Sequence, residues 1–556
     1  MKVTGFIKNK FANIFNAFRR FPATCASVVI TYVMMVLIFE KVFAEKHFIF
    51  YLAMFTGILV CLLLELTMRI FATHLPIMTA LLGVAAYGGL SILFWNNTND
   101  DLGIPLGAFF GMLALLILYI PSVKGRFDFE KNAYIYFKNA FMTALFAVVL
   151  FGGVSLIFGA VNLLLVKVSY RVYTHIAFVA FVLFAPIFFV GNLPKYEEDM
   201  TLDDDSHKPP FFQILITYVV IPLYFIFTAV LYIYFVKILI NLKWPIGEVG
   251  PLVLAYGIIG ILTFVLCDGG YNRLSAVFRR IFPFIVIVPV LTQLAAVVIR
   301  LRAYGFTESR YYLLAFSVVL IATIVILTIT NGKGIRFTAL AAAIICFISI
   351  LPAVGALDIS AHDQIVRLNY YLNKNNMIKD GKITPKTDVS SDDKKEIRSI
   401  TQYLTVTRHL TPKLKYLPVS FRFYQDFNDT FGFEANAYDT AKEHYFSIDR
   451  PFSIDVAGFS NFSMINKNEN IGFNIKFTKK DKTITISLLN GSDTLATADA
   501  TAFFDKLSSK DTGKNSVSAD ELTILLKGNK DYKLVFEYLS FSEENEIYDY
   551  NCYVLE

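Results

Sequence analysis

The chain has 556 residues, of which 55% are hydrophobic and 17% charged, and its formal net charge at pH 7 is +6. With a mean hydropathy of +0.54, it is too apolar for a soluble globular protein of this length, which excludes a cytosolic enzyme. Its five cysteines show neither zinc-finger spacing nor a disulfide framework.

Eleven apolar segments approach the ~20 residues that a helix needs to cross a bilayer. Six precede an acidic stretch and five follow it. The expected spans are 21–39, 48–66, 75–95, 102–120, 140–166, 172–190, 211–240, 251–267, 281–299, 311–330 and 335–356. The segment 211–240 is longer than one span requires and contains Pro222. We expect one kinked helix there rather than an interfacial helix that runs into a span.

The distribution of basic residues predicts the orientation of the chain. The first apolar run is too long for a signal peptide, and no small-residue cleavage site follows it. With the N-terminus in the cytoplasm, inside segments hold 17 Lys and Arg and outside segments hold 9. The positive-inside tendency therefore favours a cytoplasmic N-terminus. Because eleven is odd, the tail is expected outside the cytoplasm.

The tail after residue 356 is expected to be soluble and mainly β. Residues 364–372 and 394–410 have helical character, the second segment following a Ser-Ser-Asp-Asp cap, and 379–382 reads as a turn. A short helix is expected at 503–507. Alternating residues predict strands at 419–424, 472–477, 483–488 and 533–538.

These elements predict a polytopic all-α membrane bundle followed by a C-terminal α+β, mainly β soluble domain. The expected parts are a basic N-terminus (1–20), spans 1–6 (21–190), an acidic cytoplasmic loop (191–210), spans 7–11 (211–356), a helical linker (357–415) and a β domain (416–556).

Three stretches resemble an uncharacterised bacterial family of multi-pass membrane proteins, domain-of-unknown-function family 4153. They are Phe18–Pro22, Arg302–Tyr311 and Gln364–Ile383. The resemblance covers most of the chain and is weaker over the β tail. It implies a bacterial envelope membrane protein, which we expect in the inner membrane, and since the family has no assigned activity, it supplies no catalytic or binding residue.

The densest polar cluster lies in the expected outside loop before the tenth span. Three arginines there run against the positive-inside tendency. One interpretation is a site for an anionic lipid or ligand, in which Glu308 orients an arginine. The alternative, which we favour, is an intramolecular network that pins helix ends or docks the acidic tail. The candidate residues are Arg300, Arg302, Tyr304, Glu308 and Arg310.

Other polar groups are weaker candidates. Asp268 and Arg273, after the eighth span, form a possible second site, although a capped helix end explains them more simply. Glu65 has Arg69 at i+4, which permits a local ion pair. The acidic stretch 194–210, with His207, lacks the spacing of a calcium loop and reads as a solvated linker.

No motif indicates a metal site, a cofactor or nucleic-acid binding. The leading hypothesis is a non-enzymatic envelope protein that presents its tail to an envelope protein, an anionic lipid or a wall polymer, with membrane lipids as its surroundings. A transporter or lipid flippase is the first alternative, because proline and glycine interrupt several spans. A transferase that uses a lipid-linked donor ranks third. Such enzymes carry an acidic residue in a sizeable first outside loop, whereas the short first outside loop expected here has only Glu40 and Glu45.

Overall fold

The structure is a computed structural model that divides into two compact units. The membrane unit comprises Met1–Tyr371 and Tyr403–Leu410, and the C-terminal unit comprises Leu372–Gln402 and Thr411–Glu556. The residues that the structure describes are 14–71, 76–97, 100–123, 127–194, 196, 210–241, 249–267, 273–407, 410, 414–418, 420–435, 444–448, 452–466, 473–480, 483–491, 493–509, 516–541 and 547–556.

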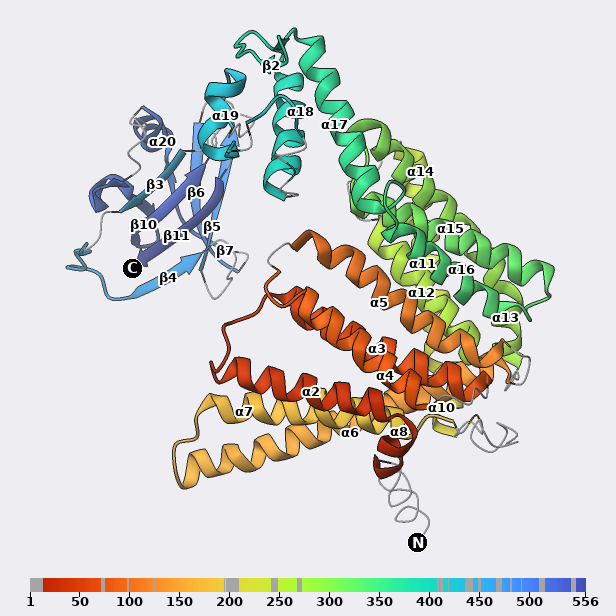
Figure 1. The fold of residues 1–556 in the computed structure, drawn as a ribbon. Coiled ribbons are helices and arrows are strands. Elements are labelled where there is room, and N and C mark those ends of the chain that lie inside the picture. Colours follow the sequence, from red (N-terminus) through yellow and green to blue (C-terminus); the bar gives the residue numbers. More distant parts are fainter. Residues whose placement is uncertain are drawn as a thin grey trace. The chain divides into compact units, whose positions relative to one another are not determined.

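Helices occupy the positions of all eleven expected spans (Figure 1). They are α2 (Pro22–Phe39), α3 (Phe48–Phe71), α4 (Pro76–Leu93), α5 (Gly103–Tyr119), α6 (Phe129–Leu164), α7 and α8 (Tyr170–Ala177, Ala185–Gly191), α10 and α11 (Pro210–Ile214, Ile221–Asn241), α12 (Val249–Leu266), α13 and α14 (Arg273–Ile285, Ile287–Tyr304), α15 (Glu308–Ile329) and α16 (Ile335–Ile350). Over the described ranges, nine spans are long and apolar enough to cross a membrane, while 77–93 and 335–350 are shorter. The multi-pass fold is thus confirmed, with eleven as an approximate count.

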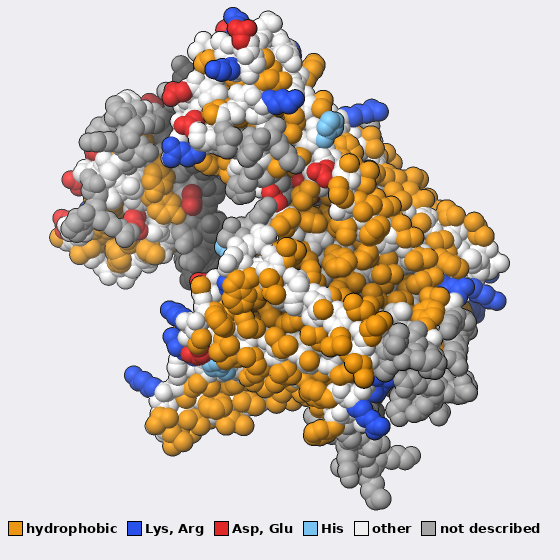
Figure 2. Space-filling model, viewed as in Figure 1, with side chains coloured by type: hydrophobic (Ala, Val, Ile, Leu, Met, Phe, Trp, Pro, Cys, Tyr) orange, Lys and Arg blue, Asp and Glu red, His pale blue; other side chains and the backbone are white. Residues whose placement is uncertain are grey.

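The two groups of spans share one core. Helix α3 packs against α2, α4 and α5, and α16, the last span of the second group, packs along α5 of the first. Large apolar side chains remain exposed along the spans, among them Leu163, Ile233 and Ile329. Figure 2 shows hydrophobic side chains covering most of the visible helical surface. In a chain of this length, such a surface is expected where lipid replaces water.

Two spans widen where a proline enters them. A π-helical segment at 178–184 precedes Pro186, and another at 215–220 precedes Pro222. Proline has no N–H to donate and its ring crowds the carbonyl four residues earlier, so a wider turn relieves the conflict. The stretch from α10 to α11 is therefore one helical segment with a local irregularity at the proline, as the sequence predicts.

The ninth span is irregular where α13 meets α14, although Val286 between them keeps right-handed helical φ and ψ. Pro289 cannot donate a hydrogen bond to the carbonyl of Ile285, four residues before it. The hydroxyls of Tyr232 and Tyr256 donate to that carbonyl instead, at 3.1 and 3.3 Å. A backbone carbonyl within a membrane span needs an internal partner because lipid offers none, and the two tyrosines supply it.

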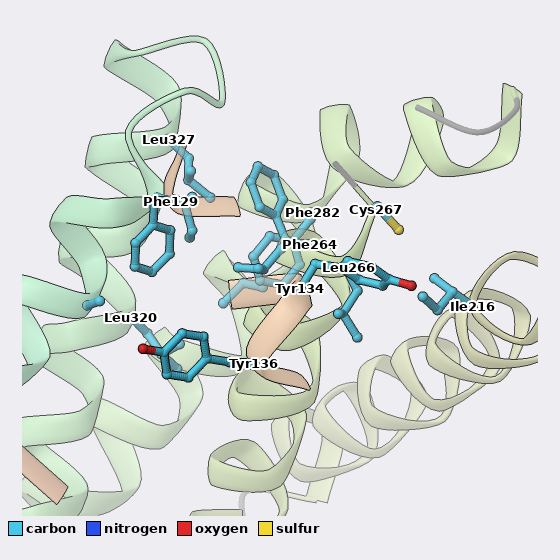
Figure 3. Close-up of a cluster of buried hydrophobic side chains, with 14 of the residues drawn as sticks. Phe129, Tyr134, Tyr136, Ile216, Phe264, Leu266, Cys267, Phe282, Leu320 and Leu327 are labelled. Carbon is cyan, nitrogen blue, oxygen red and sulfur yellow. The ribbon is translucent and has the colours of Figure 1, made fainter. Parts of the chain in front are cut away.

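Aromatic rings fill the core around this junction. Tyr224 and Tyr256 stack with ring centroids 4.6 Å apart. Gly260 faces them, and a Cβ there would collide with Phe282 and the Tyr224 hydroxyl. Further along, Phe129, Phe264, Phe282 and Leu327 lie together in one buried cluster (Figure 3). Close packing of this kind connects α6, α11, α12, α13 and α15.

The C-terminal unit opens with the end of α17 (Ala356–Lys374) and a small hairpin. Strands β1 (Ile378–Lys379) and β2 (Lys382–Ile383) pair antiparallel. Asp380 and Gly381 connect them with φ values of 49° and 73°. Two successive residues with positive φ form a type I′ turn, which confirms the turn expected at 379–382.

A nine-stranded sheet forms most of this unit. Seven strands follow the order β4-β11-β10-β9-β7-β6-β5, while β3 pairs with β10 and β8. The strands are β3 (His444–Ile448), β4 (Phe462–Asn466), β5 (Phe473–Lys480), β6 (Thr483–Asn490), β7 (Asp493–Asp499), β8 (Ser516–Val517), β9 (Thr523–Gly528), β10 (Asp531–Phe541) and β11 (Ile547–Leu555). Helix α20 (Thr501–Ser508), expected at 503–507, buries Phe504 in the core of this unit. The mainly β domain is confirmed.

One expected element of the tail is wrong, and another differs only in its bounds. The structure has no strand in the described part of 419–424; Phe423 begins α19 (Phe423–Phe431). Phe423, Phe427 and Phe431 recur every four residues, so helix formation stacks their rings at centroid distances of 4.9 and 4.4 Å. The helix expected at 394–410 is α18 (Ser391–Gln402), followed by a π-helical segment at 403–407. Ser390 caps it, its hydroxyl accepting from Asp393 N at 3.2 Å.

Candidate functional site

The candidate cluster lies where α14 ends and α15 begins, within the membrane unit. Gly305 follows the last residue of α14 with φ +69°, a conformation that glycine adopts without strain. A Cβ at this position would collide with Asp363 and Arg367 of α17. Glycine therefore both ends the helix and lets α17 approach the backbone.

Three side chains of α17 hold the loop 303–306. Asp363 Oδ2 accepts from Phe306 N at 2.7 Å. Gln364 Nε2 donates to the carbonyls of Tyr304 and Phe306, at 2.9 and 2.8 Å. Arg367 donates to the carbonyl of Ala303 at 2.8 Å. We call these contacts the α17 clasp; they satisfy carbonyls that the end of α14 leaves without helical partners.

Arg310 closes the same loop from the other side. Its Nη1 donates to the carbonyls of Gly305 and Tyr304, at 2.6 and 3.2 Å. Its guanidinium carbon lies 5.4 Å from the centre of the Tyr304 ring, within the range of a cation–π contact. The charges of Arg300 and Arg367 act on Arg310 as well, so three cations gather at this loop.

Glu308 is buried in the first turn of α15, with 5% of its surface exposed. The Tyr403 hydroxyl donates to its Oε1 at 2.6 Å. A carboxylate at a helix N-terminus is favoured by the helix dipole, and the hydroxyl satisfies one of its oxygens. Glu308, which the sequence suggested would orient an arginine, therefore bonds to Tyr403, and the tail segment 403–410 belongs to the membrane unit.

Arg300 and Arg302 lie on the last turns of α14. Arg302 is exposed and Arg300 half-buried. Cations are favoured at the C-terminal end of a helix, which supports their placement there. The structure therefore joins Arg310 to Tyr304, gives Glu308 a separate partner in Tyr403, and leaves the Arg302 side chain exposed.

The second candidate site is described only in part. Asp268 lies outside the described residues, and Arg273 is the exposed first residue of α13. The acidic stretch at 197–205 and His207 also lie outside them. Within the described ranges, no three His, Cys, Asp or Glu side chains gather as metal ligands.

Glu65 bonds to partners that the i+4 spacing does not predict. Its carboxylate accepts from Ala23 N at 2.7 Å, from Thr24 N at 3.2 Å and from Thr24 Oγ1 at 2.6 Å. These donors belong to the first turn of α2, so Glu65 caps that helix from α3. Arg69 donates to the carbonyl of Arg20.

Glu40, one of the two acids in the first expected outside loop, is paired as well. Its carboxylate contacts His175 Nε2 at 2.7 Å and Arg171 Nη1 at 3.3 Å, both on α7. Glu40 therefore pairs with the start of the sixth span.

Sequence reasoning missed two polar arrangements. It did not pair Asp363, Gln364 and Arg367 with the loop, although two of the stretches that carried the resemblance meet in this clasp. It also missed the ion pair between Glu130 of α6 and Arg279 of α13, whose Nη2–Oε1 distance is 3.2 Å. A buried acid in the first turn of a long apolar helix was the available signal.

A profile of a family described as a domain of unknown function, DUF4153, matches residues 24–373. The chain belongs to the DUF4153 family. The family match contains Arg302–Tyr311 in full, begins just after Phe18–Pro22 and ends within Gln364–Ile383. It therefore covers the spans and the α17 clasp but not the β sheet, in agreement with the weaker resemblance expected for the tail.

One curated relative is similar over much of the chain. An uncharacterised protein of Pasteurella multocida (strain Pm70) is 21% identical over 399 residues, which cover 66% of this chain and 66% of the relative. No solved structure matches. The DUF4153 match thus identifies the family, and the apolar helices indicate a multi-pass membrane protein; neither assigns an activity.

Proposed function

We propose that this protein is a bacterial inner-membrane protein with a binding rather than a catalytic role. Its membrane unit holds the β-rich C-terminal unit outside the cytoplasm, where that unit contacts an envelope protein, a ligand or a wall polymer. The observation that carries the proposal is the α17 clasp, because it anchors the first helix of the tail to the loop 303–306.

A second anchor supports the same proposal. After α18, the segment Tyr403–Leu410 belongs to the membrane unit, and Tyr403 bonds to Glu308. The chain therefore passes between the units at three points.

The bias of 17 to 9 Lys and Arg supports an outside position for the loop 303–306. Arginines there suit contacts with an anionic partner, because the guanidinium group forms paired hydrogen bonds with phosphate and carboxylate. Arg302, which is exposed, is the residue best placed for such a contact.

The test is a pair of fusions at the C-terminus of the full chain. Alkaline phosphatase after Glu556 should be active, and a fluorescent protein that matures only in the cytoplasm should be dark. The opposite pattern overturns the orientation and, with it, any contact with a wall polymer.

Arg302→Gln tests the binding role in a chain whose orientation is established. We expect this variant to bind isolated anionic wall polymer more weakly while its melting temperature in detergent stays unchanged. Arg310→Gln is the contrasting variant, since it loses two internal hydrogen bonds and should melt at a lower temperature. Wild-type binding by Arg302→Gln would remove this residue from the proposal.

A transporter or lipid flippase is the second candidate, favoured by the irregular ninth span. The Ile285 carbonyl, which loses its helical partner at Pro289, accepts from two tyrosines, and transporters often place substrate sites where the backbone of a span is irregular. Proteoliposomes with fluorescent lipid analogues would show protein-dependent flux if this candidate holds. Flux equal to that of empty vesicles would reject it for these lipids.

A further inference from the structure

A cavity of about 580 Å³ opens between α12, α13, α15 and the loop that follows α15. Its volume falls within the range of small-ligand sites, about 300 to 1,000 Å³. The cavity lies at the end of the bundle opposite to the loop 303–306, since α14 and α15 each run between the two. Its lining residues are Phe264, Ala276, Arg279, Arg280, Pro283, Phe284, Leu327, Thr328, Asn331 and Gly332.

One wall of the cavity is fixed by Arg279. Its Nη2 bonds to Glu130 Oε1 at 3.2 Å, and its Nη groups donate to the carbonyls of Phe264 and Gly332, at 3.0 and 3.3 Å. Its guanidinium carbon also lies 4.2 Å from the centre of the Phe264 ring. The Glu130 charge offsets that of Arg279, so this pair sets the shape of the wall and adds little net charge.

Arg280 gives the cavity its positive charge. Its side chain is exposed and lines the cavity. Over the described ranges, no hydrogen bond or ion pair involves Arg280, and the lining contains no acid. An arginine in this position is able to form two hydrogen bonds with one phosphate group.

Polar groups lie beside Arg280. Asn331 is exposed at the loop with φ 49°, and its amide offers donors to an oxygen-rich ligand. The Thr328 hydroxyl donates to the carbonyl of Ile324 at 2.7 Å, which leaves its oxygen able to accept. The cavity therefore combines donors for an anion with an acceptor for a hydroxyl.

The rest of the lining is mostly apolar and continues onto the lipid-facing surface. Phe264 and Leu327 belong to the buried cluster of Figure 3, whereas Phe284 is 58% exposed on a span helix. A free phosphate would leave this wall in contact with water. A ligand with a charged head and an apolar chain would cover both parts.

We propose that this cavity binds an anionic membrane phospholipid, its phosphate beside Arg280 and Asn331 and its acyl chain along Phe284 and Pro283. The site is separate from the tail and from the loop 303–306, so it adds a lipid site to the proposed function. It places the phosphate where the helix ends meet the lipid headgroups.

The experiment uses the full chain, purified in detergent and stripped of lipid, with native mass spectrometry as the readout. We expect phosphatidylglycerol to bind more tightly than phosphatidylcholine with the same acyl chains. Arg280→Gln should weaken phosphatidylglycerol binding by roughly tenfold, because a hydrogen bond to a charged group contributes about 1.5–3 kcal/mol. Lys333→Gln is the matched control, since Lys333 is exposed beside Gly332 but does not line the cavity.

A second variant tests the apolar wall without a change in charge. Ala276→Phe places a ring in the cavity and should displace the lipid, while an unchanged melting temperature shows that the chain remains folded. Equal losses in Arg280→Gln and Lys333→Gln would mean non-specific attraction and overturn the proposal. Wild-type binding by Ala276→Phe, or displacement of the lipid by inorganic phosphate at equal concentration, would overturn it as well.

Discussion

The Tyr403 hydroxyl donates a 2.6 Å hydrogen bond to Glu308 Oε1, although the two residues lie 95 positions apart. Glu308 opens the tenth span, and Tyr403 directly follows α18. The α17 clasp holds the loop 303–306 at the end of α14, and the Tyr403 bond holds Glu308, the first residue of α15. The family match ends at residue 373, so it contains the residues of the clasp, whereas Tyr403 lies beyond the matched residues.

Tyr403→Phe should destabilise the membrane unit. The change removes the hydroxyl that donates to the buried Glu308 Oε1. We expect the free energy of unfolding to fall by about 1–3 kcal/mol. Thermal unfolding of the full chain in detergent measures the effect. Tyr445→Phe is a suitable control because Tyr445 is 44% exposed in the sheet. Equal melting temperatures for all three proteins would show that the Glu308 contact contributes nothing to stability.

Gly305→Ala should detach α17 from the loop 303–306. The substituted residue would have to adopt φ +69° and would collide with Asp363 and Arg367. Gly381→Ala is the matched control, since Gly381 has φ +73° but nothing within 4 Å of the added carbon. We expect a loss of about 1 kcal/mol from strain alone in the control and a larger loss at Gly305. Protease cleavage within α17, followed by mass spectrometry, should increase only for Gly305→Ala.

The Tyr232 hydroxyl should contribute less to stability once Pro289 is replaced. Pro289→Ala restores an N–H that is able to bond to the Ile285 carbonyl within the helix, so this carbonyl no longer needs the Tyr232 hydroxyl as a donor. We expect Tyr232→Phe to lower the melting temperature of the wild-type chain by more than that of Pro289→Ala. A double-mutant cycle in detergent gives the coupling. Additive effects would mean that Tyr232 stabilises the span through packing.

Acid should weaken the C-terminal unit through Asp393. Burial raises the pKa of its carboxyl, but hydrogen bonds from Lys374, Asn375 and Ser390 and the Lys374 charge outweigh it, so the net pKa is below the ordinary value. A lowered folded-state pKa stabilises the unit above the unfolded pKa of about 3.9. This contribution is lost as the pH falls below about 4 toward the folded-state pKa. Asp393→Asn should flatten the dependence of unfolding on pH in this range; an unchanged profile would contradict the assignment.

Much of the fold could be predicted because its signals are local. Runs of apolar residues near 20 in length place the spans, and the turn at 379–382 depends on the conformational freedom of Gly381. The strands β6 and β10 follow from simple alternation. The strand expected at 419–424 was wrong because alternation over six residues was too short a signal, and the phenylalanines at 423, 427 and 431 packed on a helix face instead.

The candidate site could be predicted only as a set of residues. Tyr304, Glu308 and Arg310 are neighbours in sequence, so their grouping was visible there. Their partners were not, because Gln364 and Tyr403 come from segments that only folding brings to the loop. The pairing of Glu130 with Arg279, 149 positions apart, has the same origin.

The sequence by itself determined that this chain is a multi-pass membrane protein with a mainly β tail, because hydrophobicity and alternation act over a few turns or one strand. Only the tertiary structure decided which buried polar groups meet. Glu65 is near Arg69 in sequence but caps α2, since a buried carboxylate gains most from the helix N-terminus that packing places beside it. In a membrane the choice of partner is strict, because lipid cannot satisfy a polar group that the fold leaves unpaired.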